Sequence, residues 1–243
     1  MIFFENCQNL AFYFFRDYES DMDRIGTSVD GPAAQLFIYN PWKRYEAWRF
    51  VTYMFVHVGV MHIVMNLIVQ IFLGIALEIV HCWWRVSLVY LSGVIAGSMG
   101  TSLVNPTTYL AGASGGVYAL LTAHVATIIM NFKEMGAVNA TAQLFVFLVF
   151  IITDIGTSID RHFNDPTDSV GYIAHLSGGI AGLLVGIGVL RNLEVRRFER
   201  YLWWIAVTIY TLLMLTGISI HIFYPDWFPK NRVYISPSKS GIF

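Results

Sequence analysis

The stretch that decides the fold is residues 86–132, VSLVYLSGVIAGSMGTSLVNPTTYLAGASGGVYALLTAHVATIIMNF, which contains no Asp, Glu, Lys or Arg. Its 47 residues are enough for two bilayer crossings, since one transmembrane helix needs roughly 20 apolar residues. Four further charge-free runs lie at 50–77, 135–153, 169–190 and 201–225. Runs of this length that satisfy their backbone groups internally are helices, and the alternating pattern of a membrane β-barrel is absent. The sequence therefore predicts an all-α polytopic membrane protein.

The composition agrees with this prediction. Of the 243 residues 56% are hydrophobic and 13% are charged, about half the ordinary charged fraction of roughly 25%. This excludes a soluble enzyme or a disordered tail, and the net charge of −1 without a basic stripe indicates no nucleic-acid partner. The two cysteines, Cys7 and Cys82, form neither a disulfide framework nor a metal-binding spacing. We expect the lipid bilayer as surroundings, and no metal or cofactor.

Six transmembrane helices are predicted. They are expected at 60–80, 84–104, 113–131, 138–159, 170–190 and 201–224. The corresponding parts of the chain are an amino-terminal segment 1–31, a membrane-associated loop 32–59, a core 60–190, a cytosolic basic loop 191–200, an additional helix 201–224 and a tail 225–243. The apolar residues Ile2–Phe15 are too few for a crossing, so an interfacial or partly ordered segment is favoured there.

Basic residues in the short loops predict the orientation. The loops after the first, third and fifth predicted helices contain six of them: Arg85, Lys133, Arg191, Arg196, Arg197 and Arg200. The loops after the second and fourth helices contain only Arg161. The first set is therefore placed in the cytosol, and the loops at 104–112 and 160–169 are placed on the other side.

Three polar side chains are expected in one shallow layer near the non-cytosolic surface. Polar residues within a bilayer are energetically unfavourable, although a single Ser or His there more often joins two helices than performs catalysis. Asn66, Ser114 and His175 come from three different predicted helices. At about 1.5 Å of rise per residue, all three lie within roughly 10 Å of the same surface. This coincidence favours a catalytic site that water can reach.

A glycine pattern predicts which helices meet. One helical face carries His175, Gly178, Gly182 and Gly186. Small residues at such spacing allow close helix contact in lipid, and Gly112–Gly116 has the small residues of a matching partner. We therefore expect Ser114 and His175 to meet where these two small-residue surfaces touch, a contact called the glycine seam below. For Gly93 and Gly97 a purely packing role is expected.

The expected chemistry is that of a serine nucleophile. Ser114 begins its predicted helix, where free N–H groups and the positive end of the helix dipole can stabilise an oxyanion. A neutral His175 can act as general base. His62 and Asn66, four residues apart and so on one helical face, can assist the oxyanion.

The orientation of His175 is assigned to packing. Tyr118, four residues after Ser114, is the expected stacking partner of the imidazole. Asp154 could orient His175, but we favour an extension of its side chain to the membrane interface. The prediction is a Ser/His dyad.

At these positions the sequence resembles the rhomboid family of intramembrane serine proteases, most of all the animal secretory-pathway members. The matching elements are Trp48-Arg49, then His57, His62 and Asn66 at spacings of five and four, then Gly112-Ala113-Ser114-Gly115 with Tyr118, and finally Ala174-His175 with Gly178 and Gly182. They occur in the expected order across residues 40–190. The resemblance implies a rhomboid-like helical bundle, located in the Golgi, an endosome or the plasma membrane.

The resemblance also implies a mechanism. Ser114 would attack a peptide bond in or near the transmembrane helix of a single-pass substrate, with His175 as base, and form an acyl-enzyme. The backbone N–H of Ser114 and the side chains of Asn66 and His62 would form the oxyanion hole. His57, Trp48 and Arg49 would hold the loop before the first helix. Typical substrates include precursors of epidermal-growth-factor-like ligands.

One departure keeps an alternative open. Family members have a helix before the Trp-Arg loop, whereas only six helices are predicted here, the amino-terminal one being missing or degenerate. The alternative is a catalytically impaired rhomboid-like protein that binds transmembrane clients for trafficking or degradation. A transporter or channel is disfavoured, because its polar residues would continue to the far leaflet.

Overall fold

The structure is a computed structural model that describes residues 32–57, 60–164, 171–192 and 197–230. The predictions for 1–31, for the loop at 165–170 and for most of the tail lie outside these residues. Regular structure in the described part is helical, apart from one isolated antiparallel bridge between Tyr39 and Leu110. The all-α prediction is confirmed.

Each predicted crossing corresponds to one observed helix. The six helices are α4 (Val60–His81), α5 (Trp83–Val104), α6 (Ser114–Met130), α8 (Ala137–Asn164), α9 (Tyr172–Val189) and α10 (Arg197–Phe223). In the described part of the chain five of them are long and apolar enough to cross a membrane, while the apolar α6 has only 17 residues. A short helix, α7 (Phe132–Met135), connects α6 to α8.

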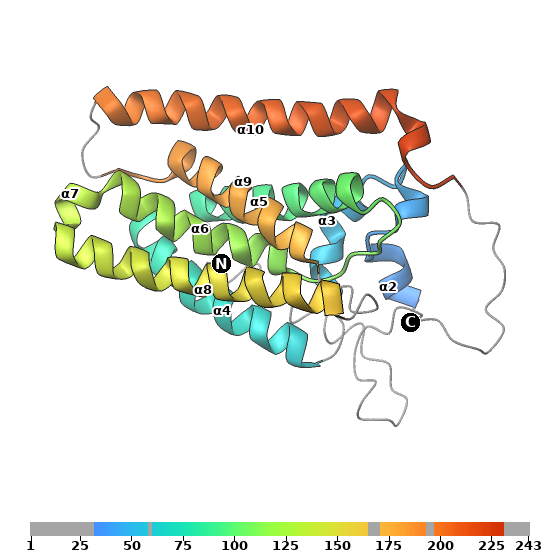
Figure 1. The fold of residues 1–243 in the computed structure, drawn as a ribbon, viewed down its shortest axis with the longest axis horizontal. Coiled ribbons are helices and arrows are strands. Elements are labelled where there is room, and N and C mark those ends of the chain that lie inside the picture. Colours follow the sequence, from blue (N-terminus) through green and yellow to red (C-terminus); the bar gives the residue numbers. More distant parts are fainter. Residues whose placement is uncertain (1–31, 58–59, 165–170, 193–196, 231–243) are drawn as a thin grey trace.

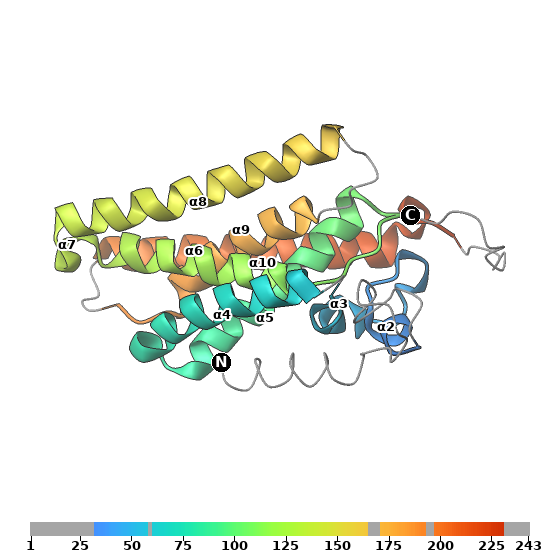
Figure 2. The same cartoon turned by 90° about the horizontal axis from the view of Figure 1, so that it is seen from below.

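The bundle has α5, α6 and α9 at its centre, with α4, α8 and α10 around them (Figures 1 and 2). Glycines on α5 permit this arrangement. A Cβ on Gly93 would lie 2.3 Å from Cβ of Ala119 on α6, and one on Gly97 would lie 3.3 Å from the carbonyl oxygen of Ala174 on α9. The packing role expected for both glycines is confirmed.

Helices α6 and α9 meet through backbone atoms. A Cβ on Gly178 would lie 2.2 Å from the carbonyl oxygen of Gly115, and one on Gly182 would lie 2.3 Å from Cα of Ala119. Glycine is therefore required at both positions. Thr122 adds a bond across the seam, because its hydroxyl donates to the carbonyl oxygen of Gly179 at 2.7 Å. The predicted glycine seam is confirmed.

The predicted loop before the first crossing contains four short helices at one end of the bundle. They are α2 (Pro32–Phe37), η2 (Pro41–Lys43), α3 (Arg49–Thr52) and η3 (Tyr53–Phe55). Two hydrogen bonds fix the loop to α5. The Tyr53 hydroxyl donates to the carbonyl oxygen of Val94 at 2.8 Å, and the Ser98 hydroxyl donates to that of Phe50 at 2.7 Å.

Helix α8 packs lightly against the bundle and diverges from α6 and α9 toward its carboxyl end (Figure 2). Its large apolar side chains are mostly exposed, among them Phe145, Val146 and Ile152. In a membrane-spanning helix such a surface faces lipid. The position of α8 affects the site, since this helix carries Asp154.

Candidate active site

Ser114 is the first residue of α6, as predicted. The preceding turn depends on Gly112, which has a φ of +117° that side chains other than glycine's rarely adopt. A Cβ on Gly112 would also lie 2.8 Å from Cε1 of His62. The serine hydroxyl therefore stands at a helix start, among backbone N–H groups that have no partner within the helix.

His57 holds this turn through a hydrogen bond to its backbone. Its side chain is 3% exposed, and its Nε2 accepts a hydrogen bond from the backbone N–H of Ala113 at 3.3 Å. Burial, and secondarily the neighbouring His62, lower the pKa of His57 to about 3. The ring is therefore a neutral acceptor at physiological pH. This geometry agrees with the supporting role predicted for His57.

His175 stacks on Tyr118 as predicted. The two rings lie 4.3 Å apart between centroids and are inclined by 11°. Tyr118 is one helical turn after Ser114, so the stack holds the imidazole beside the start of α6. Within the described residues no hydrogen bond joins Ser114 directly to His175. Catalytic hydrogen bonds are often long or poorly aligned without substrate, so the lack of a direct bond does not argue against a dyad.

The two residues predicted for the oxyanion lie on α4, which packs against α6. His62 is placed at the turn by its closeness to Gly112. Asn66 is buried, and its Nδ2 donates to the carbonyl oxygen of His62 at 2.8 Å. The amide nitrogen carries a second hydrogen that this bond does not use. The oxyanion role of both residues stays a prediction.

Asp154 departs from the expectation. The Tyr118 hydroxyl donates a hydrogen bond to Oδ2 of Asp154, and the same oxygen lies 3.7 Å from Nδ1 of His175. The side chain remains 42% exposed. Of the two positions considered for Asp154, the structure thus favours the one beside His175, because α8 presents this carboxylate to the seam between α6 and α9.

A comparison with known families matches the rhomboid domain to residues 44–192 of this chain. The chain belongs to the rhomboid family. Mouse rhomboid-related protein 2 is 43% identical over 187 residues, which cover 76% of this chain and 62% of that protein. Rhomboid-related protein 1 of Caenorhabditis elegans is 39% identical over 214 residues, which cover 84% and 60%.

A third relative has a different description. Inactive rhomboid-related protein 2 of Caenorhabditis elegans is 32% identical over 222 residues, which cover 91% of this chain and 61% of that protein. The chain thus spans about three fifths of the length of these three relatives. Membership establishes an integral, multi-pass membrane protein with a rhomboid fold.

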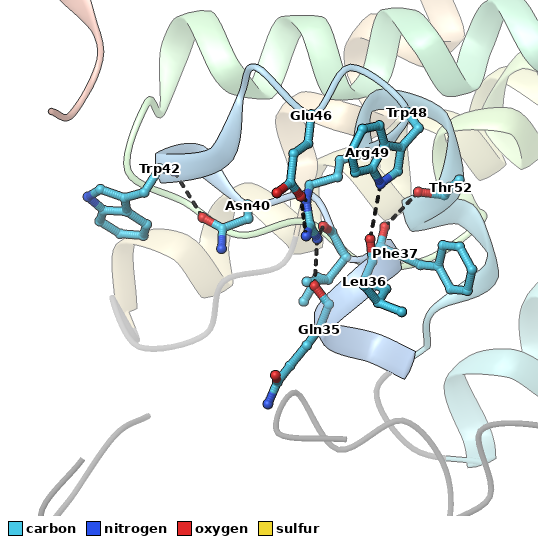
Figure 3. Close-up of polar contacts among 10 residues, drawn as sticks. Gln35, Leu36, Phe37, Asn40, Trp42, Glu46, Trp48, Arg49 and Thr52 are labelled. Carbon is cyan, nitrogen blue, oxygen red and sulfur yellow. Dashed lines mark hydrogen bonds and ion pairs between the residues drawn. The ribbon is translucent and has the colours of Figure 1, made fainter. Parts of the chain in front are cut away.

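In this rhomboid chain the Trp-Arg pair holds the loop together, as Figure 3 shows. Arg49 is 2% exposed, and its NH1 donates to the carbonyl oxygens of Gln35 at 2.7 Å and Ile38 at 2.9 Å. Its guanidinium also pairs with Glu46 at 2.5 Å. Trp48 is half exposed and donates from Nε1 to the carbonyl oxygen of Leu36 at 3.3 Å. Arg49 therefore connects α2 to α3.

Sequence reasoning missed His221, which joins the additional helix of this rhomboid to the loop. His221 Nε2 lies 2.8 Å from the Ser102 hydroxyl, and its Nδ1 lies 3.2 Å from NH1 of Arg44. Its ring stacks on Phe228 at 4.3 Å. The available signal was a titratable residue within the run 201–225, which has no Asp, Glu, Lys or Arg. No group of three or more His, Cys, Asp or Glu suited to a metal ion occurs in the described residues.

Proposed function

We propose that the chain is an intramembrane serine endopeptidase that acts through Ser114 and His175. One observation carries the proposal. The His175 ring is stacked on Tyr118, one turn from a serine that begins its helix, across a seam where α6 and α9 touch through backbone. A purely structural histidine would not need to stack on a residue one turn after the first residue of α6.

The proposed mechanism follows from these positions. His175 accepts the proton of the Ser114 hydroxyl while the serine oxygen attacks the peptide carbonyl. Negative charge on the carbonyl oxygen is stabilised by the Ser114 backbone N–H, Asn66 and His62. The protonated His175 then gives its proton to the leaving amine, which leaves an acyl-enzyme. Water, with His175 again as base, hydrolyses the ester and restores the serine.

The proposed substrates are single-pass membrane proteins, cleaved in or near their transmembrane helix. Precursors of epidermal-growth-factor-like ligands, in the Golgi, endosomes or plasma membrane, are the class that the family resemblance suggests. The turn before Ser114 contacts the loop, because the Gly112 N–H donates to the carbonyl oxygen of Tyr53 at 3.1 Å, whereas α7 follows the other end of α6. With the orientation predicted from the loop charges, cleavage would release the non-cytosolic part of the substrate.

The second candidate is a rhomboid that binds transmembrane clients without cleaving them. A relative described as inactive, 32% identical to this chain, keeps this candidate in view. Both dyad residues are present here, which favours the protease.

The test is labelling of the full chain in detergent with a serine-directed fluorophosphonate, together with cleavage of a co-expressed single-pass substrate. We expect Ser114→Ala to lose both signals, while its stability changes by less than about 1 kcal/mol, because the N-cap of α6 is Ala113 and no side chain caps this helix start. Ser87→Ala, which changes a serine on a different helix (α5), is the control and should retain both signals. Cleavage by Ser114→Ala at the wild-type rate would contradict the proposal.

A further inference from the structure

The carboxylate of Asp154 lies beside the imidazole of His175, with 3.7 Å between Oδ2 and Nδ1. We propose that Asp154 is a positioning residue that orients His175 for proton transfer from Ser114, so that the working group is Ser114, His175 and Asp154 on three different helices. This inference rests on the proposed protease function. It deepens that proposal, because the residues first suggested only a dyad.

The surroundings of Nδ1 of His175 are the first argument. This nitrogen is buried and has no hydrogen-bond partner among the described residues. A buried polar atom without a partner is uncommon and unfavourable. The carboxylate within 4 Å of it in the described structure is Asp154, whose Oδ2 lies 3.7 Å away. An Nδ1–H directed at this oxygen would satisfy the nitrogen after a shift of less than about 1 Å.

Tyr118 provides the second argument, because it fixes both partners. Its ring determines the plane of the imidazole by stacking, and its hydroxyl donates to the same Oδ2 of Asp154. The carboxylate is thereby held beside the edge of the imidazole ring that carries Nδ1. A carboxylate that served only to place α8 at the interface would not need a bond to the residue that stacks on His175.

The third argument is chemical. A neutral imidazole has one N–H and one lone pair, and a hydrogen bond at one nitrogen determines the role of the other. If Nδ1–H faces Asp154, the lone pair is on Nε2, the nitrogen left for the Ser114 proton. When His175 accepts that proton, the neighbouring carboxylate stabilises the imidazolium.

The central test observes the tautomer of His175 directly. The full chain is labelled with ¹⁵N-histidine, and the His175 signals among the seven histidines are assigned by comparison with His175→Ala. In the wild type we expect Nδ1 to carry the hydrogen. In Asp154→Asn the new amide N–H would donate to Nδ1, so the hydrogen should move to Nε2. An unchanged tautomer in Asp154→Asn would overturn the inference.

Kinetics provide the second measurement. Replacing the aspartate of a serine-protease triad by Asn lowers kcat by up to about 10⁴-fold. We expect Asp154→Asn to lower kcat by between about 10²-fold and 10⁴-fold, with KM within about twofold of the wild type, and Asp154→Glu to recover part of kcat. A residue that only packs α8 would instead change KM or stability and would leave the tautomer unchanged.

Two controls separate the possible failures. Asp160→Asn removes an exposed carboxylate from a different face of α8 and should change neither kcat nor the tautomer. Fluorophosphonate labelling of wild-type Ser114 tests the protease function alone. Absence of labelling would contradict the proposed function, whereas normal wild-type labelling with an unaffected Asp154→Asn would contradict this inference only.

Discussion

At the scale of single residues, His57 shows how burial connects protonation to stability. The folded protein keeps this ring neutral down to its pKa of about 3, whereas in the unfolded chain a histidine takes up a proton below its ordinary pKa of about 6.5. The unfolded state therefore binds more protons between these two pH values. The free energy of unfolding is therefore highest above about pH 6.5 and decreases as the pH falls toward 3.

The variant His57→Gln tests this linkage. Glutamine can still accept the hydrogen bond from the Ala113 N–H but does not titrate. In detergent, we expect the free energy of unfolding of the wild type to decrease by about 2 kcal/mol more than that of the variant between pH 7 and pH 5. Denaturation at several pH values measures this difference. Equal pH dependence in both proteins would contradict the buried, neutral assignment.

Residue spacing predicted part of the site and missed the rest. The contact between Tyr118 and His175 could be foreseen, since i, i+4 geometry and a glycine seam follow from helix periodicity. The contact of Asp154 could not, because it depends on the rotation and tilt of α8. Likewise, nothing local identifies Glu46 and the carbonyl oxygens of Gln35 and Ile38 as partners of Arg49.

At the scale of elements, the contact between α6 and α9 sets the spacing of the site. We expect Gly182→Ala to destabilise the protein by about 1–3 kcal/mol and to lower activity, because its Cβ would lie 2.3 Å from backbone atoms of Ala119. Backbone cannot rotate away as a side chain can. Thermal unfolding in detergent and a cleavage assay measure the two effects.

A glycine with free space around it provides the matched control. On α8, no atom lies within 4 Å of the position that a Cβ on Gly156 would occupy, so Gly156→Ala should be neutral or slightly stabilising. If both variants behaved alike, the effect at Gly182 would come from helix propensity and the close contact would be unimportant.

The helices themselves were more predictable than the segments between them. Runs of apolar residues located all six long helices to within a few residues, except at the carboxyl end of α8 and the amino-terminal end of α10, which extend further than predicted. The loop at 32–57 folds into short helices that docking on α5 stabilises, and its sequence has no periodicity long enough to predict them.

At the scale of the whole molecule, His221 joins the last helix to the first described segment. We expect His221→Phe to retain the stack on Phe228 but to lose the bonds to Ser102 and Arg44. Arg44 belongs to the loop and Ser102 to α5, so the loss of these bonds should weaken the attachment of α10 to the loop and to α5 by about 1–2 kcal/mol. Hydrogen exchange should therefore become faster in residues 32–57 and remain unchanged in the seam of α6 and α9.

A neighbouring exposed residue tests whether this effect is specific. Ser219→Ala, two residues earlier on α10, changes an exposed side chain and should leave exchange in the loop as in the wild type. Uniformly faster exchange in His221→Phe would show general destabilisation and would contradict a local joint. His221 and Arg44 are 177 positions apart in the sequence, which explains why local patterns did not reveal their contact.

Helix α10 is attached near both of its ends. Trp203 donates to the carbonyl oxygen of Gly188 at 2.7 Å near one end, and His221 contacts Arg44 and Ser102 near the other. A helix longer than the local hydrocarbon layer responds by tilting. Tilting of α10 in a thinner bilayer would therefore displace Arg44. We expect lipid chain length to affect the order of the loop at 32–57, which contains Arg44.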